Sequence, residues 1–108
     1  MYILFYQIPL AKDKWYWQTL RIVNSLDNKE KQEIKREIER RRKWHNLAVK
    51  LSKELRKVGC KRVAQGIYEF NDTNREAVEK LVKHYIRQFS RLGVNPLFVI
   101  SKLVERYG

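Results

Sequence analysis

The sequence has few of the residues that interrupt or cross-link a chain. Its 108 residues include one cysteine, two prolines and four glycines, and the glycines stand far apart. A single cysteine excludes an internal disulfide, so we expect Cys60 to pack as a small hydrophobic residue rather than act as a nucleophile. Isolated glycines exclude a glycine-rich phosphate loop. These absences remove disulfide-stapled scaffolds and P-loop enzymes from consideration.

Long apolar runs are also missing. No segment approaches the roughly 20 apolar residues of a membrane-spanning helix, and the N-terminus lacks the basic region and the cleavage site of a signal peptide. We therefore expect a cytoplasmic protein without membrane contact. Hydrophobic residues make up 44% of the chain, which suffices for one core. Because no repeat or linker divides the sequence, residues 1–108 are expected to form a single domain.

Acidic residues are too few to balance the basic ones. Twenty-four lysines and arginines oppose twelve aspartates and glutamates, which gives a net charge of +12. Such a charge concentrates polyanions around a protein. The alternative is a thermophile-like composition rich in charged surface residues, but that surface would be closer to neutral. The imbalance favours contact with nucleic acid.

The most prominent feature is a segment without glycine or proline between Asp27 and Val58. Asp27 can cap a helix there, with Glu30 three residues later, and Gly59 stands where a left-handed C-terminal cap belongs. We therefore expect one long basic helix over about 28–58. At about 1.5 Å per residue it would run roughly 45 Å, which exceeds the width of a domain of this size.

The two halves of this predicted helix differ. The second half has a core-facing apolar stripe formed by Trp44, Leu47, Ala48, Leu51, Leu55 and Val58. In the first half glutamates occupy that arc, and Ile34 and Ile38 lie about a third of a turn away. Either the first half projects beyond the core, or the helix kinks near residues 40–44. A projecting half predicts a partner interface at Ile34, Ile38 and Trp44.

The opposite side of the helix is almost uniformly positive, with four consecutive basic residues at 40–43. A ridge of this kind can neutralise several phosphates at once, with steep salt dependence. The alternative is a solvated face supported by pairs such as Glu39 with Lys43. The candidate nucleic-acid-binding residues are Lys31, Lys35, Arg36, Arg40, Arg41, Arg42, Lys43, Lys50, Lys53 and Lys57.

The N-terminal segment predicts a strand followed by a helix. Residues 2–9 read as a strand that is apolar on both faces, so both faces should be covered. Asp13 can cap a helix over 14–26, with Tyr16, Leu20 and Val23 as its core stripe. Trp15 or Trp17 is then left for edge packing, a partner or a stacked base.

The C-terminal half predicts two further strands around one helix. Residues 61–70 read as a strand in which Gly66 marks a bulge or bends the chain into two neighbouring strands. Thr73 and Glu76 predict a capping box for a helix over 74–92. Residues 94–101 read as a strand, and residues 102–107 fit either a strand or a helix. This order predicts an α+β sandwich with helices on one face of the sheet.

Two segments resemble a known family. They are Tyr6-Gln7-Ile8-Pro9 and, after Gly59, the run Arg62-Val63-Ala64-Gln65-Gly66-Ile67-Tyr68-Glu69. They resemble the small ferredoxin-like subunit of CRISPR adaptation, which is related to VapD-type ribonucleases and to the C-terminal domain of PaaX-type repressors. The resemblance implies a ferredoxin-like sandwich of three to four strands, a homodimer formed through the sheets, and contact with a nucleic-acid backbone.

The chain departs from that family at two points. Gln7 stands where the family has a presumed metal-binding Asp, and a neutral amide is a poor ligand for Mg²⁺ or Mn²⁺. The segment between the two motifs is also longer than the family's single helix. His45 and His84 have no partners at metal-ligand spacing. We therefore expect no catalysis, no metal and no cofactor.

These observations favour a non-catalytic, dimeric protein that grips the phosphates of duplex DNA, because a rigid helical ridge suits a duplex. Three alternatives stay open. The chain could bind RNA or a single strand stacked on Trp15 or Trp17. It could be an adaptor whose long helix binds another protein. The third alternative is a divergent metal-dependent nuclease.

Overall fold

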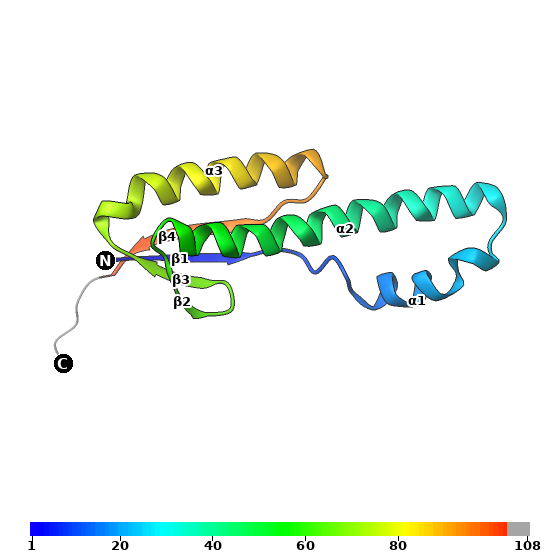
Figure 1. The fold of residues 1–108 in the computed structure, drawn as a ribbon, viewed down its shortest axis with the longest axis horizontal. Coiled ribbons are helices and arrows are strands. Elements are labelled where there is room, and N and C mark those ends of the chain that lie inside the picture. The colour runs from blue at the N-terminus through cyan, green and yellow to red at the C-terminus, as the bar shows by residue number, and fades with distance from the viewer. Residues whose placement is uncertain (104–108) are drawn as a thin grey trace.

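The computed structural model describes residues 1–103. Its helices and strands follow in the order β1 (Tyr2–Gln7), α1 (Lys14–Ile22), η1 (Val23–Ser25), α2 (Asn28–Lys57), β2 (Lys61–Ala64), β3 (Ile67–Phe70), η2 (Asp72–Asn74), α3 (Arg75–Arg91) and β4 (Leu97–Lys102), where η denotes a 3-10 helix. The molecule measures 62 × 28 × 19 Å, and α2 runs along its long axis (Figure 1). No helix among the described residues is long and apolar enough to cross a membrane.

The four strands form one antiparallel sheet in the order β2-β3-β1-β4. Helix α3 and the C-terminal half of α2 lie over one of its faces (Figure 1). This confirms the α+β class and the placement of the helices on one face. Residues 61–70 form a hairpin of two strands, with a bulge between Arg62 and Ala64 and a positive φ of 74° at Gly66. Glycine adopts this φ without the steric cost that a side chain would add.

The main core lies between the sheet and these two helices. Alternate residues of β1 and β3 point into it, as the strand period of two requires. They meet the apolar stripes of α2 and α3, which include Leu51, Leu55, Val78, Tyr85 and Phe89, none more than 1% exposed. Trp44 belongs to this core, and its indole N–H donates to the carbonyl of Pro9 at 2.8 Å.

The other face of the sheet carries exposed apolar side chains. Phe5 and Val99 lie opposite each other on β1 and β4 and are 41% and 43% exposed. Leu97 is exposed on the same face, opposite Gln7. Within one chain only one face of β1 is covered, because all the helices that contact the sheet lie on one side of it (Figure 1).

Helix α2 is continuous, and its N-terminal half projects beyond the sheet without a kink. Helix α1 runs antiparallel beside this half (Figure 1). A second, smaller cluster of buried side chains joins the two helices, and it consists of Tyr16, Val23 and Ile38, with Leu20 and Ile34 packed against it. Helix α1 thus covers Ile34 and Ile38, which corrects the expectation that a partner protein does so.

Helix boundaries follow the predicted caps with two exceptions. Asp13 and Asp27 accept backbone N–H groups of Tyr16 and Glu30, each at 3.0 Å. Gly59 adopts the predicted left-handed conformation with φ of 94°. The capping box at Thr73 is wrong, because residues 72–74 form a 3-10 turn and the cap of α3 makes no side-chain bond.

The second exception is the predicted helix over 14–26, which ends at Ile22 and continues as the 3-10 helix η1. The strand boundaries also shift. β1 ends at Gln7, and β4 runs from Leu97 to Lys102 because Pro96 precedes its first paired residue. Of the ambiguous residues 102–107, Lys102 ends the strand, and residues 104–107 lie outside the described part of the chain.

Candidate nucleic-acid interface

The ten basic residues predicted to bind nucleic acid divide into two groups by their contacts. In the first group the side chains are bonded to other residues of the chain, and Arg41 is one of them. Its guanidinium pairs with Glu37 and Asp13, each at 2.9 Å, and donates to the carbonyl of Ala11 at 3.1 Å. It also lies 4.6 Å from the ring centroid of Trp15. With its side chain only 17% exposed, Arg41 joins α2 to the start of α1 and is poorly placed to meet a phosphate.

Arg40 and Arg42 are also engaged. Arg40 bonds Glu37 through two nitrogens, at 2.8 and 2.9 Å, and donates to the carbonyl of Leu92 at 2.7 Å. This last bond ties α2 to the end of α3. Arg42 donates to the hydroxyl of Tyr16 at 3.1 Å. Three of the four consecutive basic residues at 40–43 therefore have a structural role within the chain.

Carboxylates beside these arginines are held in their charged form. A hydrogen bond from Arg40 is the main cause that keeps the pKa of Glu37 below its usual value, and Arg41 acts in the same direction. For Asp13, the backbone N–H of Tyr16 contributes most to lowering the pKa, followed by the hydrogen bond from Arg41. The sequence indicates these pairs only through the position of Glu37, which stands three residues before Arg40 and four before Arg41.

The second group of basic residues faces solvent. Lys35, Arg36, Lys43, Lys53 and Lys57 are exposed, and none takes part in the six ion pairs found among residues 1–103. Lys31 is half-buried, and Lys50 lies 4.0 Å from Glu54, the longest of those pairs. These side chains form what we call the α2 ridge: Lys31, Lys35, Arg36, Lys43, Lys50, Lys53 and Lys57.

A groove of about 530 Å³ interrupts the α2 ridge where α2 passes the end of α3. We call it the junction groove. It is lined by Lys35, Arg36, Glu39, Arg40, Lys43 and Leu92, so four cations face one carboxylate. Because a single carboxylate offsets only part of this positive charge, the junction groove is electropositive.

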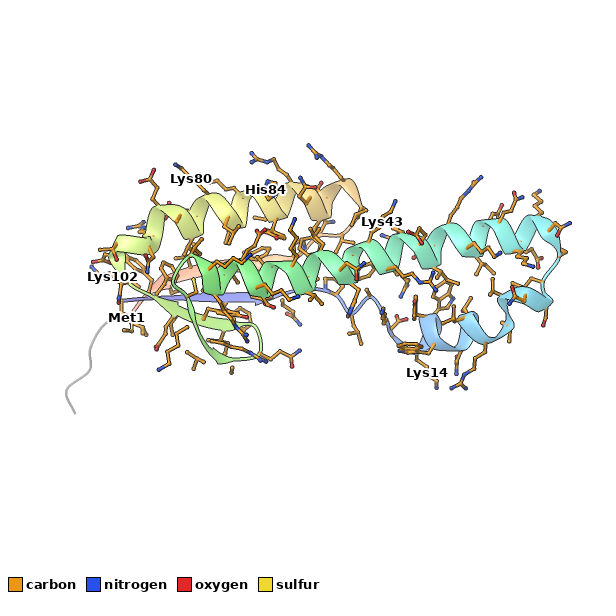
Figure 2. All side chains as sticks on the ribbon, in the orientation of Figure 1. Met1, Lys14, Lys43, Lys80, His84 and Lys102 are labelled. Carbon is orange, nitrogen blue, oxygen red and sulfur yellow. The ribbon has the colours of Figure 1, made fainter. Side chains whose placement is uncertain are left out.

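The outer face of α3 extends this positive surface. Figure 2 shows Lys43 at the junction and Lys80 and His84 on α3, all pointing to the same side of the molecule, while Lys14 of α1 points to the opposite side. Further exposed basic residues of α3 are Lys83, Arg87 and Arg91. The basic surface of the molecule thus spans two helices.

Two exposed aromatic side chains lie on α1. Trp15 is 39% exposed and is covered on one side by Arg41, and Trp17 is 50% exposed with the ammonium of Lys12 6.0 Å from its ring centroid. Both therefore reach the surface, as expected for side chains left over from the core stripe. Each already has a cation near its ring, which occupies part of the area that a base would use for stacking.

Groups with catalytic or metal-binding chemistry are scattered. Among the described residues no three His, Cys, Asp or Glu side chains come together to hold a metal ion. Cys60 is buried in the main core, and this burial raises the pKa of its thiol to about 11. Gln7 lies exposed at the end of β1. What the basic side chains of α2 and α3 offer a ligand is positive charge and hydrogen-bond donors.

Comparisons with protein-family models, with curated proteins and with solved structures give no match to this chain. The resemblance to the CRISPR-adaptation group stays a prediction.

Proposed function

We propose that this protein binds duplex DNA through the α2 ridge, without catalysis. The observation that carries the proposal is the junction groove together with the row of exposed lysines on the same helix, which few carboxylates oppose. Phosphate contacts of this kind hold a polymer without reading its sequence. Binding is therefore expected to depend little on base sequence and strongly on salt.

Rigidity favours a duplex over a flexible strand. The 30 residues of α2 span about 45 Å, longer than one turn of DNA. The first half of this helix is held by α1, and the second half is packed on the sheet, so the cations keep a fixed spacing. A preorganised ridge loses less side-chain and backbone entropy on binding than a mobile arm would.

The proposal narrows the set of contact residues. We assign phosphate contact to the α2 ridge, with Arg36 and Lys43 at the junction groove as central members. Arg41 is assigned to the attachment of α1 because its guanidinium is bonded to Ala11, Asp13 and Glu37, and Arg42 is assigned there through the bond from its Nε to Tyr16. Arg40 lines the groove while bonded to Leu92, so it both supports the groove and faces it.

The test is binding to a random-sequence duplex at 50 and 200 mM salt. We expect Lys35→Ala, Arg36→Ala and Lys43→Ala together to weaken binding by about tenfold or more and to reduce the salt slope by about two to three. The matched control removes three exposed charges elsewhere, at Lys14, Arg21 and Lys102. Equal losses in both triple variants, or salt-independent binding by the parent protein, would contradict the proposal.

RNA and single strands are competitors in the same assay, because Trp15 and Trp17 are exposed. If a single strand binds more tightly than the duplex, and Trp17→Ala removes this difference, the ligand is a single strand and not duplex DNA.

We also propose a ferredoxin-like fold and a homodimer for this chain. The fold assignment is supported by the strand order β2-β3-β1-β4 and by helices that connect β1 to β2 and β3 to β4. The dimer is supported by the exposed apolar side chains of Phe5, Leu97 and Val99 on the open sheet face. Sedimentation should give the mass of two chains for the parent and one for Phe5→Lys, and a single-chain mass for the parent at micromolar concentration would contradict the dimer.

A further inference from the structure

A second groove lies on a different side of α2, between the end of β1 and the β2–β3 turn. It has a volume of about 600 Å³, and we call it the β1-end groove. Its walls come from residues 5–11, from α2 between Trp44 and Arg56, and from the hairpin between Arg62 and Tyr68. None of its lining residues is an aspartate or a glutamate.

Two guanidinium groups converge on this groove. Arg56 comes from α2, and Arg62 comes from β2. Arg62 lies opposite Tyr68 in the sheet, so both side chains belong to the face that the helices cover. Within residues 1–103 neither arginine belongs to an ion pair. Both are exposed, so their donors are available to a ligand.

Tyr6 lines the groove together with both arginines. Burial raises the pKa of its phenol, and the charges of Arg62 and Arg56 act in the opposite direction. The ring of Tyr6 stacks on that of Tyr68, with centroids 5.9 Å apart. The groove therefore has a positive end beside an aromatic wall.

The remaining walls are apolar or neutral and are held in place. Ile8, Ala48 and Val49 supply apolar surface, while Ser52 and Gln65 supply neutral hydrogen-bonding groups. The bond from Trp44 to Pro9 fixes the segment after β1.

Gly66 fixes the opposite wall of the groove. The N–H of Tyr6 donates to its carbonyl at 2.8 Å, and a Cβ at position 66 would lie 2.5 Å from the carbonyl oxygen of Tyr6. The β2–β3 turn can therefore approach β1 this closely only because residue 66 is a glycine.

We infer that the β1-end groove binds one nucleoside monophosphate unit, either as a free nucleotide or as the last nucleotide of a strand. The two arginines hold its phosphate, since a guanidinium pairs with phosphate through two parallel hydrogen bonds. The base packs on the apolar wall, with Ser52 and Gln65 at its polar edge. A volume of about 600 Å³ falls within the range of small-ligand sites.

This inference goes beyond the proposed duplex binding because the two surfaces use different faces of α2. Val49, Ser52 and Arg56 are three and four residues apart, so they share one helix face. Lys43, Lys50 and Lys57 follow at intervals of seven and share another. A duplex on the ridge does not fill the β1-end groove.

The experiment titrates adenosine 5′-monophosphate (AMP) into the full chain and measures heat of binding. We expect adenosine, which lacks the phosphate, to bind at least tenfold more weakly, and Arg56→Ala with Arg62→Ala to weaken AMP binding by at least tenfold. The matched control is Lys35→Ala with Lys43→Ala, which removes the same charge from the α2 ridge at the junction groove, away from Arg56 and Arg62. It should weaken duplex binding and leave AMP binding unchanged.

The two sources of the ligand are separated with single strands that carry or lack a terminal 5′-phosphate. If the 5′-phosphorylated strand binds more tightly than AMP, and the Arg56 and Arg62 variant loses this tighter binding, the ligand is the end of a strand. AMP binding without an effect of the terminal phosphate identifies a free nucleotide.

Two results would overturn the inference. One is that adenosine binds as well as AMP, or that no AMP binding appears at millimolar concentration. The other is an equal loss of AMP binding in both double variants. If the Arg56 and Arg62 variant does not fold, amide shifts in the unaltered protein decide instead. AMP should then shift the amides of Tyr6 and Gly66, and shifts confined to the α2 ridge would refute the site.

Discussion

The two ends of α2 are held by different kinds of contact. At the sheet end, fourteen buried residues form one cluster between the sheet and the two helices that cover it. At the projecting end, three buried residues join α2 to α1, and Arg41 and Arg42 add polar bonds across the same interface. The first end has the apolar area to set the stability of the fold. The second depends on charged groups as well as on its three buried residues.

The largest effect is expected from a cavity at the sheet end. Leu55 is fully buried between α2 and the sheet, so Leu55→Ala should lower the free energy of unfolding by about 3 kcal/mol, through lost burial and an unfilled cavity. Urea denaturation measures this, and Val49→Ala on the exposed side of the same helix is the control. A loss below about 1 kcal/mol would mean that this core does not dominate stability.

Ile38→Ala tests the smaller cluster. Ile38 is 4% exposed but has few buried neighbours, so we expect a loss of about 2 kcal/mol, at the low end for a buried isoleucine. Hydrogen exchange should show that the loss is local, because amides of α1 would exchange faster while those of β1 would not. Ile22→Ala, at a position 54% exposed, is the control. Equal acceleration at both ends would show that the two clusters unfold together.

Acid should separate the two ends. The pKa values of Asp13 and Glu37 are lowered in the folded chain, so their contribution to stability is present above their unfolded pKa values and is lost as the pH falls through the folded ones. We therefore expect α1 to detach below about pH 4 before the sheet end unfolds. Hydrogen exchange across this range tests the order, and Arg41→Ala should flatten the pH dependence of α1. A single transition for both ends would contradict it.

Sequence periodicity predicted the elements well and their partners poorly. The bounds of α2, the caps at Asp13 and Asp27 and the stripe of Tyr16, Leu20 and Val23 all depend on residues close in the chain. The position of α1 does not, because periodicity shows that Ile38 needs cover without showing what covers it. Prediction of a partner interface there failed for this reason.

Arg41 shows the same limit at the level of one side chain. From the sequence it is one of four consecutive cations, and its local neighbour Glu37 indicates at most a surface ion pair. Its other partners, Asp13 and the carbonyl of Ala11, lie 28 and 30 residues away in the chain. The β1-end groove was missed for the same reason, since its two arginines come from elements that meet only in the folded chain.

The smallest effect on stability is expected where the two ends meet. Lys43 is exposed in the junction groove and has no ion-pair partner among residues 1–103, so Lys43→Ala should change the free energy of unfolding by less than about 0.5 kcal/mol. It should still weaken duplex DNA binding and lower the salt slope by about one. Arg40→Ala is the matched comparison, because it removes a charge from the same groove and also breaks the bond to Leu92. It should lose stability as well as affinity, since the carbonyl of Leu92 then loses its donor and Glu37 keeps only its bond from Arg41. If Lys43→Ala destabilises the fold as much as Arg40→Ala does, the division of the basic residues into a supporting group and a binding group is wrong.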